Sequence, residues 1–261
     1  MAFVQGLDVS NFQGAFDWQA QKGKIGFGMA KATEGTAFTD GQLGHNWDSM
    51  WALDRLMPRF AYSFFHPGQD PVAQAAHLVA AVKPHGLLPG DNFVLDLETS
   101  DGHSPAVVAG VAHEFLQEVN RLAPGHRVLV YTNPSFAQAG NCAGLGSWYL
   151  WLASYGVPAP VAPQPWSKAT FWQFTDQPID GDRFMGSHEQ LLAFCRMPGQ
   201  REGRNEHVHY RAADDHAGQR GIQRQQRHHI RRHREGTRPH RLQRLHPGAV
   251  PGPGRVGGVV E

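Results

Sequence analysis

The sequence predicts an α/β fold in which a parallel sheet, covered on both faces, closes into a barrel. Seven short apolar runs typical of strands alternate with longer segments of helical spacing. Polar or aromatic residues recur late in these runs, and the chain of 261 residues is 41% apolar, enough for a substantial core. We therefore expect an irregular TIM-like β/α barrel, whose chemistry gathers at the carboxyl ends of its strands.

The expected elements follow the chain in an even alternation. The predicted strands are Phe3–Val9, Ile25–Thr33, Arg59–Phe65, Asn92–Thr99, Arg127–Thr132, Tyr149–Tyr155 and Thr170–Phe174. Helical spacing is found in Gly41–Leu56, in Pro71–Val82 and most clearly in Ser104–Leu122, where Ser104 is the expected N-cap. After Tyr131 the helical segments are short and rich in proline, so we expect irregular connections there.

Charge and composition divide the chain near Pro198. Up to that residue there are 11 Lys+Arg against 17 Asp+Glu, and from Gly199 onward 13 Arg, no Lys and 6 acids. The second part holds one aromatic residue, Tyr210, and cannot bury a core. We predict a folded domain over residues 1–198 and a disordered basic C-terminal tail, Arg/His-rich and of low complexity, over residues 199–261.

The predicted tail has three interpretations. A solvated segment without a role of its own is the simplest. Its arginines could instead bind polyanions non-specifically, with the barrel as their carrier, and this binding would weaken steeply with salt. The abrupt change to arginine without lysine also fits a frame-shifted reading of a GC-rich gene, which sequencing of the locus would test.

Several classes of site and of location are not expected. Cys142 and Cys195 can form at most one bridge, and no His or Cys spacing matches a zinc site, so we predict no metal and no cofactor. Neither a Gly-x-Ser-x-Gly elbow nor a phosphate-binding glycine loop occurs. The amino terminus has neither the basic start nor the apolar run of a secretory signal. No stretch approaches the roughly 18 consecutive apolar residues of a transmembrane helix. We expect a monomer made in the cytoplasm, with no specific nucleic-acid partner and no transmembrane segment.

Two acids interrupt the fourth predicted strand. Asp96 and Glu98 are two residues apart, so they project from one face of an otherwise apolar run, with Cα atoms about 6.6 Å apart. Because burying a carboxylate costs several kcal/mol unless it is paired or neutral, such a strand usually uses its acids. One reading is a catalytic pair that titrates together and reaches one substrate bond. The other is a structural ion-pair cluster with Lys or Arg from a neighbouring strand.

Segments in a fixed order resemble the glycoside hydrolase family 25 lysozymes, the N-acetylmuramidases of phages, bacteria and some fungi. They are Gly6–Gly14 with Asp17-Trp18, Lys31–Gly35 with Asp40 and Asn46, Ala61–Phe64, Leu95–Glu98, and near the end Trp172–Phe174 with Ile179–Phe184. The resemblance covers about residues 3–197. Where the family usually has Asn this chain has Asp182, and we assign the family's carboxylate to Asp180 because Ile179 and Phe184 hold the spacing.

The resemblance implies a catalytic barrel that cuts peptidoglycan between N-acetylmuramic acid and N-acetylglucosamine. Glu98 is the expected general acid, kept protonated by burial. Asp96 is expected to stay ionised, either as nucleophile or as the group that orients the substrate's acetamido oxygen. By resemblance, Asp8 and Asp180 complete an acidic cluster that binds sugar hydroxyls; on its own, Asp8 could equally be a turn aspartate beside Ser10.

Aromatic side chains in a cleft can stack on the apolar faces of sugar rings, although an aromatic in a barrel strand is more often part of the core. The expected substrate-binding residues are Tyr62, Phe64, Tyr131, Tyr155 and Trp172, of which Tyr62, Tyr131 and Trp172 are preferred. Glu34 could be a second acid near the pair or a solvated loop residue.

Two other functions remain open: a non-catalytic module that binds cell-wall glycan, and a chitinase-like barrel hydrolase, whose strand also carries an Asp-x-Glu pattern. The expected place of action is the bacterial cell wall, reached by phage-type release or from outside the cell.

Overall fold

The computed structural model describes residues 2–195, so the predicted tail lies outside the described residues. The strands are β1 (Val4–Val9), β2 (Phe27–Glu34), β3 (Phe38–Thr39), β4 (Arg59–Phe64), β5 (Asn92–Asp96), β6 (Val128–Thr132), β7 (Tyr149–Ala153), β8 (Phe171–Thr175) and β9 (Gly181–Phe184). The helices are α1 (Leu43–Leu53), α2 (Pro71–Val82), α3 (Pro105–Leu122), α4 (Pro134–Phe136) and α5 (His188–Phe194), and short turns of other helix types lie between them. All seven predicted strands and the three predicted helices are present.

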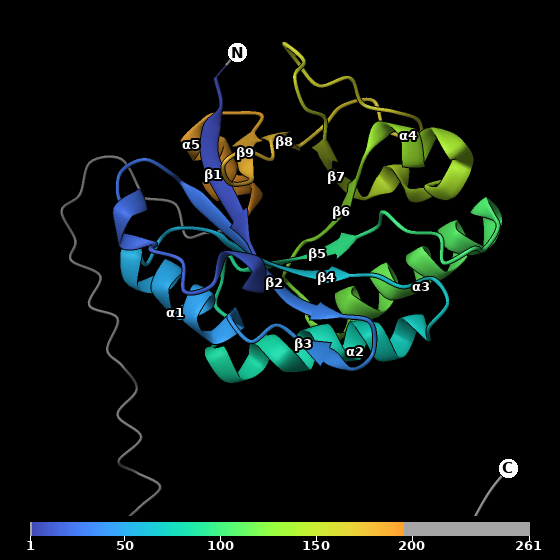
Figure 1. Cartoon of the computed structure of the whole chain (residues 1–261), viewed down its shortest axis with the longest axis horizontal. Helices are drawn as coiled ribbons and strands as arrows, with labels where there is room; N and C mark the ends of the chain where they lie inside the picture. The colour runs from blue at the N-terminus through green and yellow to red at the C-terminus, as the bar shows by residue number, and fades with distance from the viewer. Residues whose placement is uncertain (1, 196–261) are drawn as a thin grey trace, which may run out of the picture. The chain divides into compact units, whose positions relative to one another are not determined.

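Eight of these strands close into a barrel, which confirms the predicted class of fold (Figure 1). From β2 through β4, β5, β6 and β7 to β8 the neighbouring strands are parallel. β1 pairs in parallel with β2 on one side and antiparallel with β9 on the other, and β9 also pairs antiparallel with β8. The expected sheet was parallel throughout, so β9 is a correction: an antiparallel strand closes the barrel.

Two other sequence expectations need correction. The fourth predicted strand was expected to reach Thr99, but β5 ends at Asp96. Ser104 does occupy the N-cap position of α3, but its side chain makes no capping hydrogen bond. Asp70, which was not predicted as a cap, is the N-cap of α2, because its Oδ1 accepts from the amides of Val72 and Ala73.

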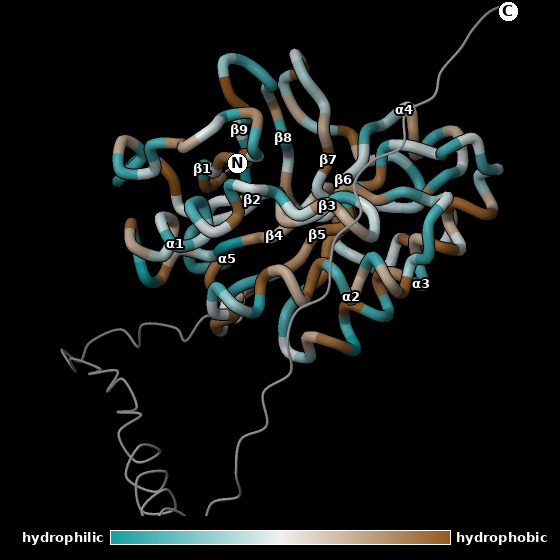
Figure 2. The backbone as a smooth tube through the Cα atoms, turned by 60° about the horizontal axis from the view of Figure 1, so that its bottom comes forward, coloured by the Kyte–Doolittle hydropathy of each residue, from teal (hydrophilic) through white to brown (hydrophobic). Residues whose placement is uncertain are grey.

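Long helices cover only one half of the barrel. α1, α2 and α3 lie along the outside of β2, β4 and β5 (Figure 1), whereas short turns and loops connect β6 to β9. Hydrophobic and hydrophilic residues alternate along α2 and α3 (Figure 2), as expected for helices with one face on a core. The outer core between helices and sheet includes Leu78, Phe93 and Phe115, each fully buried.

A second core fills the barrel itself. Phe27, Phe60 and Phe171 contribute buried rings that meet edge to face, with centroids 5.1 to 6.1 Å apart. α5 adds Leu191 to this cluster. Gly6 on β1 leaves room for the ring of Phe27, because a Cβ at this position would lie 2.3 Å from that ring. The interior is therefore packed with side chains rather than open as a pore.

A buried ion pair joins two strand ends at the bottom of the sheet. Arg59, at the start of β4, donates from Nε and Nη2 to the two carboxylate oxygens of Asp91, at 2.8 and 2.6 Å. Both side chains are almost fully buried, and the guanidinium lies 4.3 Å from the ring centroid of Trp47. Asp91 also accepts from the amide of Leu88. Removing one partner would leave a buried charge without compensation.

We predict that Arg59→Met lowers the free energy of unfolding by about 3–5 kcal/mol, because Asp91 would remain buried without its cation. Urea unfolding of both chains measures the change. As a control, Arg121→Met removes an exposed arginine that pairs with Glu118 and should leave the unfolding midpoint where it is. Equal midpoints for Arg59→Met and the native chain would contradict the assigned role.

Candidate functional site

The inward-facing side chains change from apolar to polar toward the carboxyl ends of the parallel strands. Every second residue of a strand points into the barrel. The inward series runs from Phe27 and Met29 to Lys31 on β2, from Val94 to Asp96 on β5, from Leu129 to Tyr131 on β6, and from Phe171 to Gln173 on β8. The uppermost layer of the interior is therefore polar and open at one end.

This layer lines a cavity of about 380 Å³. Its lining residues are Asp8, Ser10, Phe12, Gln13, Lys31, Glu34, Tyr62, Phe64, Asp96, Glu98, Tyr131, Trp151, Tyr155, Gln173 and Asp180. Nine of the ten side chains predicted for the site are among them, from seven separate strands or the loops that follow or precede them. The structure thus brings together residues that are far apart in the sequence.

Asp96 and Glu98 both face the cavity although β5 ends between them. The chain stays extended, since Leu97 donates its amide to the carbonyl of Tyr131 at 2.9 Å and buries its side chain in the outer core. Asp96 is 7% exposed, whereas Glu98 is exposed at the open side. Neither acid forms an ion pair with any described residue, and Asp96 Oδ1 has no hydrogen-bond partner among them. The structure therefore does not support the interpretation of Asp96 and Glu98 as a structural ion-pair cluster.

Asp8 is held at the floor of the cavity by an oriented amide. Gln173 donates from Nε2 to Asp8 Oδ2 at 2.7 Å. Its Oε1 accepts from the hydroxyl of Tyr131 at 2.9 Å and from that of Tyr155. Two phenol donors thus fix which end of the amide faces Asp8. Asp8 also donates its backbone amide to the carbonyl of Asp180, 3.3 Å away.

Burial, together with the charges of neighbouring acids, raises the pKa values of Asp8 and Asp180. Burial, followed by the charge of Asp180, raises the pKa of Asp8 to about 7, against hydrogen bonds from Gln173 and Asp182. Burial, followed by the charge of Asp176, raises the pKa of Asp180 to about 6. The phenols of Tyr131 and Tyr155 also have pKa values raised chiefly by burial, that of Tyr155 to about 12, so both remain donors at neutral pH.

The central pair departs in part from expectation. Although Glu98 is exposed in the open cleft, loss of hydration against the surrounding protein raises its pKa, and the nearby charge of Lys31 lowers it in part. This is the expected direction for a general acid. Asp96 was expected to stay ionised, but burial and then the charge of Glu98 raise its pKa well above the ordinary value. The free cleft therefore favours a proton on Asp96 as well, contrary to that expectation.

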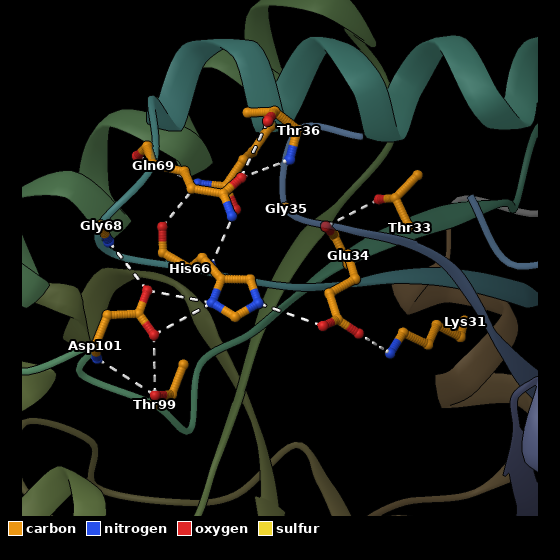
Figure 3. A network of polar contacts seen from close by, with 12 residues as sticks. Lys31, Thr33, Glu34, Gly35, Thr36, His66, Gly68, Gln69, Thr99 and Asp101 are labelled. Carbon is orange, nitrogen blue, oxygen red and sulfur yellow. Dashed lines mark hydrogen bonds and ion pairs between the residues drawn. The ribbon is translucent and has the colours of Figure 1, made fainter. Parts of the chain in front are cut away.

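A chain of charged groups connects one wall of the cleft to the loop that carries Glu98 (Figure 3). Lys31 Nζ lies 2.6 Å from one oxygen of Glu34, and the other oxygen lies 3.3 Å from His66 Nε2. His66 Nδ1 lies 3.2 Å from the Asp101 carboxylate, which also accepts from the amide of Gly68 and the hydroxyl of Thr99. The hydrogen bond from Lys31 lowers the pKa of Glu34. The network ties the loops after β2, β4 and β5 together.

Trp172 is the predicted site residue that does not reach the cavity. It is 4% exposed, and its Nε1 donates to the carbonyl of Ser154 at 2.7 Å. The Arg183 guanidinium lies over its ring at 5.2 Å and over the ring of Phe174 at 4.0 Å. Its neighbour Gln173 points inward instead. The position of Trp172 therefore does not support the predicted contact with substrate.

Several cavity residues were not selected from the sequence. Gln173 and Lys31 lie within quoted motifs, but nothing in their types indicated a role. Trp151 lies in the predicted strand Tyr149–Tyr155, where an aromatic residue is more often part of the core. Phe12 is 86% exposed at the cavity, on a turn closed by a capping box between Ser10 and Gln13. A run of polar residues directly after a predicted strand was the available signal for this turn.

Asp182, the alternative to Asp180, lies on β9 and is fully buried. Asp180 lines the cavity, and Asp182 does not. Cys142 and Cys195 are both buried and free. Within residues 2–195, no cluster of His, Cys, Asp and Glu could hold a metal ion. None of the helices in that range has the length and apolar character needed to cross a membrane.

Comparison with known proteins agrees with this architecture. Residues 7–182 match the family model described as glycosyl hydrolases family 25. The chain is 30% identical over 222 residues to Lysozyme M1 of Streptomyces globisporus, covering 74% of this chain and 71% of that protein. It is also 30% identical over 215 residues to N,O-diacetylmuramidase of Arthroderma benhamiae, covering 74% of this chain and 87% of that one.

The fold has close counterparts among solved structures. The crystal structure of a bacterial lysozyme from Streptomyces coelicolor aligns with a TM-score of 0.67 and 26% sequence identity. The alignment covers 76% of this chain and the whole of that one. Since the family model spans most of the folded domain and the relatives agree with it, the chain belongs to family 25 of the glycosyl hydrolases.

Proposed function

We propose that this glycoside hydrolase cleaves bacterial peptidoglycan at the β-1,4 bond between N-acetylmuramic acid and N-acetylglucosamine. The observation that carries the proposal is the acidic layer at the mouth of the barrel, where Asp96 and Glu98 face one open cavity with Asp8 and Asp180. The names of the relatives, a lysozyme and an N,O-diacetylmuramidase, support this class of substrate. The place of action that follows is the bacterial cell wall.

In the proposed reaction Glu98 protonates the leaving glycosidic oxygen. A proton is needed there because an alkoxide is a poor leaving group, and positioned acids contribute about 10²–10⁴-fold to such steps. Glu98 suits this role because its carboxyl lies at the open side of the cleft and its pKa is raised by lost hydration. We assign the proton of the working state to Glu98 rather than to the more deeply placed Asp96.

Asp96 then carries the negative charge that stabilises the oxocarbenium-like transition state. It acts as nucleophile or orients the substrate's acetamido oxygen for internal attack, and both routes retain the anomeric configuration. Lys31 supports this charge from β2, because its ammonium lowers the pKa of Asp96 against the effect of burial. The charge of Glu98 also raises the pKa of Asp96, so the two carboxyls titrate as a pair.

The remaining cavity residues would hold the sugar. Tyr62, Phe64, Tyr131 and Tyr155 offer ring faces, the three tyrosines also offer hydroxyls, and the exposed ring of Phe12 adds a further surface at the rim. Asp8, Asp180 and Glu34 offer acceptors for sugar hydroxyls. Such an arrangement of aromatic walls and a few fixed polar groups is typical of carbohydrate clefts.

We predict that Glu98→Gln lowers the rate of peptidoglycan clearance by about 10²–10⁴-fold, because the amide cannot donate a proton. Turbidity of purified walls measures the rate for the full chain, with chitin as a second substrate. The matched control is Glu114→Gln, an exposed acid on α3, which should clear walls at the native rate. If the folded native chain binds walls without clearing them, the protein is a binding module. If it releases fragments from chitin, the protein is a chitinase-like hydrolase.

We predict that Lys31→Met moves the alkaline limb of the pH–activity profile to higher pH. Activity requires protonated Glu98, so it is present below the Glu98 pKa and lost as pH rises through it. Lys31 lowers that pKa, so its removal raises it further. The measurement is initial rate against pH, with the exposed Lys168→Met as control. A limb that stays in place or moves to lower pH would exclude Lys31 as a determinant of the Glu98 pKa.

A further inference from the structure

Asp182 is a buried acid that the proposed reaction does not use. It lies on β9, in register with Gly6 on β1 and with Gln173 on β8, and its side chain is 0% exposed. Trp151 donates from Nε1 to Asp182 Oδ1 at 2.7 Å. Oδ2 meets no donor among the described residues. A buried ionised carboxylate with one oxygen left unpaired is costly, so this position favours the neutral, protonated form of Asp182.

The group next to Asp182 is another carboxyl. Asp8 and Asp182 lie within hydrogen-bonding reach of each other, and that contact can form only if one of them holds a proton. The other charged groups that face this pair are also acidic: Asp180 in the loop before β9, and Glu98 across the cavity from Asp8. Lys31, the cation on the cavity wall, acts on Asp96 and Glu98.

We propose that Asp182 is a neutral carboxylic acid that donates a hydrogen bond to Asp8 and so holds the Asp8 carboxyl in place at the floor of the cleft. Asp182 is then a positioning residue, because it acts on substrate only through Asp8. The role of Asp182 in catalysis rests on the proposed function, whereas the protonation of Asp182 is independent of that function.

Three observations fix Asp182 as the donor and Asp8 as the acceptor. Asp182 is the more deeply placed of the two, since Asp8 lines the cavity and Asp182 does not. Burial, followed by the charge of Asp8, raises the pKa of Asp182 well above its ordinary value. Asp8 already accepts from the Gln173 amide, which the hydroxyls of Tyr131 and Tyr155 hold in one orientation. Donors from β8 and β9 thus meet on Asp8.

The first test is the pH dependence of unfolding of the full chain and of Asp182→Asn. A raised pKa means that the folded state keeps a proton which the unfolded chain releases above about pH 4. Stability is therefore lost as pH rises from there toward the folded pKa. Asparagine donates without titrating, so the unfolding equilibrium constant of the native chain should rise with pH about tenfold per pH unit more steeply than that of Asp182→Asn. Asp48→Asn, which removes an exposed acid of α1 that is remote from the cluster, should keep the native slope.

The second test compares turnover of soluble glycan fragments by Asp182→Asn and Asp182→Leu near neutral pH. The amide should keep the native kcat, because it still donates to Asp8. Leucine, similar in size but without a donor, should lower kcat by about tenfold to a hundredfold. Equal activity of the two variants would overturn the positioning role.

Equal pH slopes of unfolding for the native chain and Asp182→Asn would show that Asp182 is ionised and would overturn the proposal, and this result does not require the leucine variant to fold. A native chain that cleaves no glycan would refute the proposed function. In that case the unfolding comparison would still decide where the proton lies.

Discussion

The burial of several carboxyls beside one another, where each charge is poorly hydrated and repels the next, is the constraint on which the rest of the site depends. Asp8, Asp96 and Asp182 are each less than one-tenth exposed, and Asp180 and Glu98 lie beside them. Five acids so close together cannot all ionise, because each charge raises the free energy of the next and burial removes the water that would screen it. The cluster must hold protons, and a site that holds exchangeable protons at the mouth of a cleft is suited to acid catalysis.

The barrel makes this arrangement possible by separating two kinds of interior. Below the mouth, the rings of Phe27, Phe60 and Phe171 fill the lumen and exclude water. Above them, Lys31, Tyr131 and Gln173 supply groups that stabilise the acids: a cation, a hydroxyl and an amide. The aromatic layer therefore stabilises the fold and also sets the low-polarity floor that raises the pKa values of the acids.

Most of the fold could be predicted from the sequence because the parallel strands are apolar, short and evenly spaced. β9 could not, since Gly181-Asp182-Arg183-Phe184 has no apolar run and becomes a strand only by pairing with β1 and β8. Asp96 and Glu98 stood out because charge is rare in a buried strand. Trp172 was chosen because aromatic rings stack on sugars, but β8 is covered on both faces, and a strand of that kind does not reveal which alternate residues point inward. Lys31 has meaning only through neighbours from other strands.

The most direct measurement of the proposed activity is the identity of the new reducing ends after complete digestion of purified peptidoglycan. Borohydride reduction converts each newly formed end into a sugar alcohol, which mass spectrometry distinguishes. Cleavage at the proposed bond predicts that the reduced ends are muramic acid derivatives. Glucosamine at those ends would mean that the acids of this cleft act on the other glycosidic bond of the wall, and it would contradict the assignment.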